Sequence, residues 1–274
     1  MDLHDCEFGR RMRERLERGE LELHPLPDIA RRVLFAAGDV SSSAASLAKL
    51  VQQDPALASA VLRRANAAGL GAAAPATSVQ HAIARLGTRR LSETAVALAM
   101  REGPFKGAFC QATLRRLWLR ALASGLFAKE LARTQRGNVE RAFVAGLLWR
   151  VGEALALGGL VDEFGAAALP DEEATAELAA SLGEAFTSAA VQSWRLPEAL
   201  AAVIDTAREP GPEFADDRHI ARLAHSLAMH PPEEPDAEKL HADADAVALG
   251  VYPEDLDAIW ALAPKIREEL ESLG

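Results

Sequence analysis

Histidine and cysteine are the residue types that most often bind metals or act as nucleophiles, and the chain has seven histidines and two cysteines. His219, His225 and His230 fall on one predicted helix, six and five residues apart. Side chains meet on a helix surface at spacings of three or four residues, so these three do not share a face. We interpret them as exposed or partly buried helix residues. Cys6 and Cys110 belong to no CxxC pair and have no histidine at zinc-ligand spacing, so neither a zinc site nor a disulfide framework is expected.

No segment has the glycine pattern of a phosphate-binding loop. The sequence contains neither GxxxxGK[ST] nor a GxGxxG after a predicted strand, and the glycines at 69 and 71 are interpreted as part of a turn. No serine lies in a nucleophile elbow. Cys110 has no histidine close to it in the predicted fold order, and we interpret it as a core residue.

Basic residues are concentrated in the first half of the chain. Residues 1–150 carry 23 Lys+Arg against 14 Asp+Glu, whereas residues 151–274 carry 7 against 26. Either the two halves face each other and their charges pair, or the basic half binds an acidic partner. The net charge of −10 and the scarcity of aromatics near the arginine pairs argue against nucleic acid as a partner. The candidate partner-binding residues are Arg10, Arg11, Arg13, Arg63, Arg64, Arg89 and Arg90.

The composition favours an all-α fold. Ala and Leu, both strong helix formers, dominate a chain in which only 5% of the residues are aromatic. We expect no apolar run long enough to span a membrane and no secretory signal at the N-terminus, and hence a cytoplasmic protein without membrane insertion.

Helices are predicted from apolar periodicity and from their start and stop signals. In the first, Phe8, Met12 and Leu16 form one apolar stripe that needs cover, so the helix is expected to dock on the main domain or on a partner. Gly87 is expected to separate two helices. The predicted helices lie at about 3–18, 28–37, 44–53, 54–69, 78–86, 88–101, 108–134, 138–157, 171–182, 185–194, 198–207, 216–229, 237–249 and 254–272.

Several motifs occur in an order that resembles one family. Leu26-Pro27, residues 47–57 (LAKLVQQDPAL) and residues 62–66 (LRRAN), then residues 78–91 (SVQHAIARLGTRRL), resemble the start of an HDOD domain; Leu117-Trp118, residues 145–148 (AGLL) and residues 194–197 (WRLP) follow in family order. The resemblance implies an all-α, two-lobed helical bundle of the HDOD type. It covers roughly residues 24–230, where we expect an HDOD domain with lobes at 24–103 and 104–230. Outside it, the residue pattern predicts an N-terminal amphipathic helix over 1–23 and C-terminal helices over 231–274.

HDOD domains resemble the HD phosphohydrolases, which hold metal with a lone His, a His-Asp pair and a further Asp. In this sequence the position of the lone His falls at Arg120, and the His-Asp pair falls at Trp149-Arg150. Two further family positions that carry His align with Glu184 and, approximately, Asp205. Arginine stays protonated and cannot ligate a metal. The resemblance therefore implies a vestigial HD pocket, made of these five residues, with no metal, no cofactor and no catalytic residue.

The charges of the vestigial HD pocket suggest how it is filled. Arg120 or Arg150 could pair with Glu184 or Asp205 and tie the same helices that a metal would join. The alternative is that these side chains point to solvent.

We expect a non-catalytic bacterial signal-transduction module that acts as a scaffold or adaptor by binding other signalling proteins. The alternative is a sensor in which Arg120 and Arg150 bind an anionic small molecule such as a nucleotide. A residual phosphohydrolase is the third and least favoured interpretation.

Overall fold

The computed structural model describes residues 7–28, 31, 32, 49, 51–66, 75–229 and 240–273. These residues form an all-α fold without strands. Most residues of the helices predicted at 28–37 and 44–53 lie outside the described residues. The described helices are α1 (Glu7–Glu17), α4 (Pro55–Asn66), α5 (Val79–Glu102), α6 (Gln111–Thr134), α7 (Val139–Leu148), α8 (Val151–Phe164), α9 (Glu172–Trp194), α10 (Glu198–Ile204), α11 (Ala215–Met229), α13 (Ala244–Ala248), α14 (Pro253–Trp260) and α15 (Ala263–Leu273), with short 3-10 turns at Ala166–Ala168 and Pro212–Phe214.

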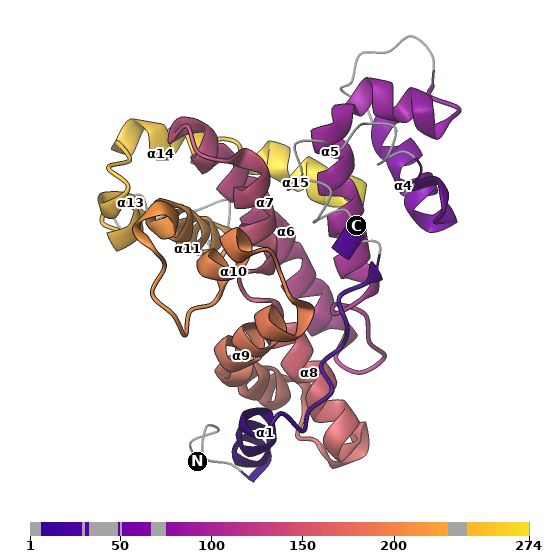
Figure 1. The fold of residues 1–274 in the computed structure, drawn as a ribbon, viewed down its shortest axis with the longest axis vertical. Helices are drawn as coiled ribbons and strands as arrows, with labels where there is room; N and C mark the ends of the chain where they lie inside the picture. The colour runs from indigo at the N-terminus through magenta and orange to yellow at the C-terminus, as the bar shows by residue number, and fades with distance from the viewer. Residues whose placement is uncertain are drawn as a thin grey trace.

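Helix α6 runs through the middle of the molecule (Figure 1). It packs against α7 and α11 along much of its length and also touches α8, α14 and α15. Helices α4 and α5 pack on each other and form the upper right of Figure 1, whereas α8 and α9 pair below. One continuous apolar core joins these parts, from Met12 in α1 to Ile266 in α15. The two halves of the bundle are therefore packed as one body.

The structure divides one predicted helix and joins two others. The helix predicted at 138–157 is broken at Arg150, whose backbone leaves the helical region at φ −122° and ψ 27°. The helices predicted at 171–182 and 185–194 are one helix, α9, that passes through Gly183. The reason is packing: a Cβ on Gly152 would overlap the Gly183 carbonyl oxygen and Thr187. Both glycines let α8 and α9 approach closely, so Gly183 does not end its helix.

The C-terminal prediction of one helix over 254–272 is also wrong. Helix α14 ends at Trp260, and α15 begins at Ala263. Pro264 is the second residue of α15, where proline is tolerated because the first turn has no partners for its N–H groups. By contrast, the turn predicted at Gly87 is confirmed: its φ of 77° and ψ of 164° interrupt α5.

Helix α1 docks on α8 and α9, and its apolar stripe is covered. Met12 is fully buried, and the Phe8 ring meets the Phe164 ring edge to face at 4.8 Å. Arg11 lies 2.7 Å from Glu163 and also covers the Phe164 ring. The chain then runs along the molecule towards α5 (Figure 1). There the Trp194 indole donates a hydrogen bond of 3.0 Å to the His24 carbonyl, which fastens this segment to the end of α9.

One stretch of the described residues, Val139–Phe164, is apolar and long enough by composition to cross a membrane, so the expectation that no run reaches that length is wrong. The structure divides it between α7 and α8, and most of its apolar window is buried inside the bundle. Buried core helices of globular domains have the same composition.

Candidate functional site

The vestigial HD pocket brings two arginines close to a histidine. Arg120 lies on α6, Arg150 stands at the junction of α7 and α8, and His225 lies on α11. Burial of the imidazole, and then the positive charges of Arg150 and Arg120, lower the pKa of His225 to about 4. Both guanidinium groups are therefore near enough to His225 to disfavour its protonation, and the imidazole is neutral at pH 7.

Arg150 makes two contacts with carboxylates. Its Nε donates a hydrogen bond of 2.6 Å to Glu153, which is in the first turn of α8. Its Nη1 lies 3.6 Å from Glu184 on α9, but the Glu184 side chain is 70% exposed. The predicted Arg150–Glu184 pair thus exists, at the surface of the molecule, where such pairs contribute about 0–1 kcal/mol. The pair is therefore not buried, and we do not expect its loss to cost several kcal/mol.

Asp205 serves a different purpose from the predicted one. It is buried at the end of α10, where it accepts hydrogen bonds from the Ser188 hydroxyl at 2.6 Å and from the Ala207 amide at 3.1 Å. These bonds fix the turn that follows α10. Neither Arg120 nor Arg150 is among its described partners, so this alternative for the vestigial HD pocket is wrong.

Sequence reasoning missed Arg218, which binds the same turn at the end of α10. Its guanidinium donates to the backbone carbonyls of Ala202 at 2.6 Å, Asp205 at 2.7 Å and Val203 at 3.2 Å. These carbonyls belong to the C-terminal turn of α10, which has no helical partners for them. Burial lowers the pKa of Arg218, and Glu209 and Asp205 counteract the shift. Arg218 therefore acts as a structural cap.

The remaining two predicted pocket residues differ in burial. Trp149 is buried in the core. Arg120 is half-buried and, within the part of the chain that the structure describes, forms no ion pair with a carboxylate. Arg120 therefore leaves one positive charge uncompensated beside His225.

This arrangement does not suit a divalent metal. A metal site needs neutral imidazole or carboxylate groups that converge on one point. The two arginines repel a cation, while Glu184 pairs with Arg150 and Asp205 accepts from Ser188. Among the described residues no three His, Cys, Asp or Glu side chains gather closely enough to hold an ion.

His225 is the site residue that sequence reasoning interpreted as an ordinary helix position. The signal that could have found it is the buried stripe of α11. Ala221 and Ala224 are fully buried on that stripe, and His225 is four residues beyond the first and adjacent to the second. That spacing places it at the edge of the face that packs on α6.

The predicted partner-binding arginines do not form one surface. Arg11 is bound to Glu163 and Arg89 to Glu140. Arg13 and Arg64 are half-buried and have interactions of their own. Arg10 on α1, Arg63 on α4 and Arg90 on α5 are exposed and, among the described residues, form no ion pair.

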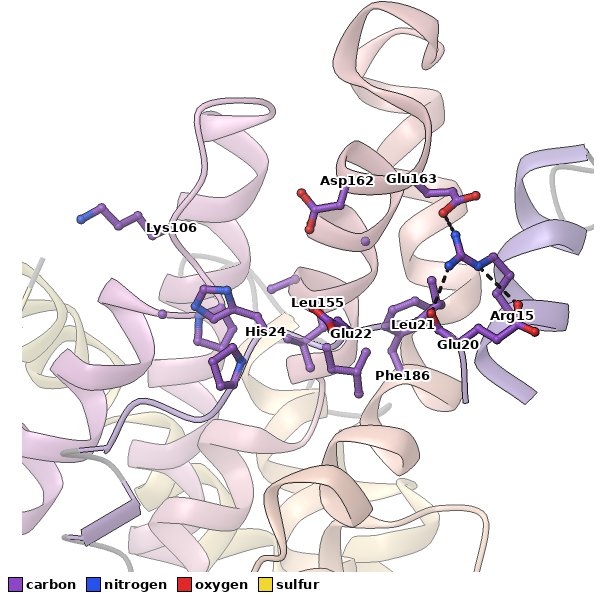
Figure 2. Close-up of a pocket in the computed structure, with 17 residues that line it drawn as sticks. Arg15, Glu20, Leu21, Glu22, His24, Lys106, Leu155, Asp162, Glu163 and Phe186 are labelled. Carbon is purple, nitrogen blue, oxygen red and sulfur yellow. Dashed lines mark hydrogen bonds and ion pairs between the residues drawn. The ribbon is translucent and has the colours of Figure 1, made fainter. Parts of the chain in front are cut away.

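A cavity of about 660 Å³ lies between residues 20–25, α8 and the turn at 103–106. Figure 2 shows Arg15 reaching towards Glu163 and Glu20 at one end, while Lys106 and His24 lie at the other. None of the vestigial HD pocket residues lines it. We assign the Arg15 contacts there to holding α1 against α8.

The domain assignment follows from comparison with known families. The model of the HDOD domain matches residues 23–210, more than two thirds of the chain. The chain belongs to the HDOD domain family. The motifs noted in the sequence fall inside this match, whereas α1 and helices α11 to α15 fall outside it.

Solved structures share the HDOD fold over the whole chain. A protein from Shewanella amazonensis named as a candidate metal-dependent phosphohydrolase is 20% identical, with a TM-score of 0.73 and full coverage of both chains. An HDOD domain protein of unknown function from Geobacter sulfurreducens is 22% identical, with a TM-score of 0.68, and the match covers 96% of this chain and 99% of that one. A candidate signal transduction protein from Marinobacter aquaeolei is 19% identical, with a TM-score of 0.64, and the match covers 97% of this chain and 65% of that one. At these identities the likeness establishes the fold. No curated protein matches the chain.

Proposed function

We propose that this HDOD protein is a non-catalytic module of bacterial signal transduction that works by binding other signalling proteins. The observation that carries the proposal is that Arg120 and Arg150 both lie near a neutral His225. The resemblance to HD enzymes places metal ligands at these two arginine positions. Without a metal the HD reaction has no means of generating its nucleophile. The name of the Marinobacter relative and the family match are consistent with a signalling role.

Partner binding is tested by reversing exposed charges in the full chain. Arg63→Glu and Arg90→Glu change exposed arginines on α4 and α5, and Arg115→Glu makes the same change at an exposed position of α6 outside the candidate set. Partners isolated by crosslinking in cells should be lost with the first two variants and retained with the third. Equal retention by all three variants would contradict the assignment of these arginines, and metal-dependent hydrolysis of a cyclic dinucleotide would contradict the proposal as a whole.

A second candidate function is a sensor that binds an anionic small molecule, such as a nucleotide, in the vestigial HD pocket. The uncompensated charge of Arg120 favours it, because an anion there would offset the repulsion between two guanidinium groups. Bound anion should raise the pKa of His225 from about 4 towards its ordinary value.

Nuclear magnetic resonance of the imidazole during titration with AMP measures this shift. Arg120→Gln should abolish the AMP effect, and the exposed control Arg115→Gln should not. An unchanged His225 pKa at saturating nucleotide would rule out the sensor.

A further inference from the structure

A small cavity of about 100 Å³ lies where α15 crosses α5 and α6 (Figure 1). Four basic side chains line it: Arg90 from α5, Lys129 and Arg133 from α6, and Lys265 from α15. One water molecule occupies about 30 Å³ of liquid volume, so the cavity has room for a few waters or for one small oxyanion.

Two of the four cations have carboxylate partners. The Lys129 ammonium is buried and lies 2.7 Å from Glu93, and Arg133 contacts Glu130 one turn earlier on the same helix. Arg90 and Lys265 are exposed and, among the side chains that the structure describes, neither forms an ion pair. The lining therefore carries more positive than negative charge, and the cations repel one another when the cavity holds only water.

Besides these cations the lining contains one carboxylate, Glu130, and three apolar side chains. The apolar residues are Leu126 from α6, Leu262 just before α15, and Ile266 in the first turn of α15. Ile266 belongs to the core of the molecule, so this wall is a continuation of the packed interface between α15 and α6. A ligand with a charged head and a small organic group would meet both kinds of surface.

The position of the cavity gives a role to the C-terminal helix. Helix α15 lies outside the HDOD match, which ends at residue 210. Lys265 is its contribution to the charged lining, and Arg90 faces it from the HDOD domain. An anion held between them would link the C-terminal helix to α5.

We propose that this cavity binds the phosphoryl group of a soluble phosphate ester, with Arg90 and Lys265 as its main ligands. A guanidinium can offer two parallel hydrogen bonds to phosphate oxygens, and an ammonium adds a compact charge. Lys129 and Arg133 also line the cavity, each paired with a glutamate. This site uses none of the vestigial HD pocket residues, and it goes beyond the function proposed above.

Thermal unfolding and calorimetric titration of the full chain with inorganic phosphate test the site. Sodium chloride at equal ionic strength is the reference, because phosphate also stabilises proteins non-specifically. The test variant is the double change Arg90→Gln and Lys265→Gln. The control is Arg115→Gln with Lys106→Gln, which removes the same charges from exposed positions that do not line the cavity.

Phosphate should raise the midpoint of unfolding of the wild type and of the control above the chloride value. The test variant should bind phosphate at least about tenfold more weakly, the effect of losing a charge-assisted hydrogen bond. In chloride alone the test variant should be as stable as the wild type or more stable, since repulsion is relieved. A role of the two residues in folding alone predicts a less stable variant instead.

Further results decide the proposal and the source of the phosphoryl group. An equal response of test and control variants to phosphate would overturn the site, and so would the absence of any response in the wild type. Tighter binding of O-phosphoserine than of inorganic phosphate, lost in the test variant, would support the soluble ester. Binding to phosphatidic acid vesicles that the test variant alone loses would confirm the phosphoryl chemistry but move its source to a lipid. Arg120→Gln should leave phosphate binding unchanged, which separates this site from the vestigial HD pocket.

Discussion

At the scale of single residues, His225 links the vestigial HD pocket to the stability of the fold. Its pKa is about 4 in the folded chain, against about 6.5 for an ordinary histidine. Above pH 6.5 the imidazole is neutral in both states and has no effect on the pH dependence. As the pH falls from 6.5 to 4, the unfolded chain takes up a proton that the folded chain does not, so the folded state loses stability.

The free energy of unfolding should therefore fall in that window by up to about 1.4 kcal/mol per pH unit from this residue. Chemical denaturation between pH 7 and 4 measures the slope. His225→Gln should make it shallower, whereas His81→Gln, at an exposed position on α5, should leave it as it is. The same slope in both variants would mean that His225 is protonated in the folded protein.

The buried pair Glu93–Lys129 joins α5 to α6 and gives a second prediction at this scale. The two charges are 2.7 Å apart and both residues are buried, and the second Glu93 oxygen has no hydrogen-bond partner in the described structure. Lys129→Met should cost about 3–5 kcal/mol because it leaves a buried carboxylate unpaired. The double variant Lys129→Met with Glu93→Leu should recover most of this loss in denaturant titrations. If the changes in the free energy of unfolding of the two single variants simply add in the double variant, the pair is not coupled.

For the vestigial HD pocket, sequence reasoning anticipated the Arg150–Glu184 contact but not the contacts of Asp205 or the approach of His225. Family motifs place Arg120, Trp149 and Arg150 in order along the chain. The choice of Glu184 over Asp205 as partner depends on how far α10 extends, because the carboxylate of Asp205 turns back to Ser188 at its end. The approach of His225 depends on how α11 is rotated against α6, which spacing alone did not reveal.

At the scale of elements, the close approach of α8 and α9 positions Arg150. The Gly152 amide donates a hydrogen bond of 3.1 Å to the Thr187 hydroxyl, and Gly183 packs on the Glu153 side chain. A side chain at either glycine would separate the two helices. The break before α8 and the continuity of α9 thus have one cause, and both place Arg150 beside Glu153.

Gly152→Ala should destabilise the chain by roughly 1–3 kcal/mol through overpacking and should also raise the pKa of His225 as Arg150 moves away. Gly158→Ala is the matched control on the same helix, where an added Cβ meets nothing within 4 Å. The control should be neutral or stabilising by about 0.5–1 kcal/mol, since alanine favours a helix interior. Heat denaturation of both variants checks this, and a harmless Gly152→Ala would contradict the packing account.

The sequence predicted which segments form helices better than it predicted where each helix begins and ends. The stripe of α1 and the turn at Gly87 were predicted from periodicity and from glycine chemistry, and both are present. The errors at Gly183 and before Arg150 arise where tertiary packing decides between a close contact and a break. Pro264 could have placed the start of α15, because proline inside an otherwise apolar pattern marks a new first turn.

At the scale of the whole molecule, the two oppositely charged halves are joined by ion pairs. Arg11 of the basic half binds Glu163, and Arg141 lies 2.5 Å from Asp217. The Arg11–Glu163 pair contains an exposed arginine and contributes about 0–1 kcal/mol, whereas Asp217 is buried. Sodium chloride near 1 M screens charges beyond roughly 3 Å, so the midpoint of thermal unfolding should fall modestly from its low-salt value. A clear rise would show that repulsion within the acidic half outweighs attraction between the halves.

The central proposal concerns the place where the resemblance to HD enzymes puts metal ligands: we propose that the arginines there keep this protein from holding a divalent ion. The most direct measurement is elemental analysis of the full chain after equilibration with manganese and gel filtration, combined with an assay of cyclic dinucleotide hydrolysis. Since Arg120 and Arg150 repel cations and the nearby carboxylates are engaged, the account predicts no stoichiometric manganese and no hydrolysis. One or more manganese ions per chain, together with metal-dependent hydrolysis, would contradict it.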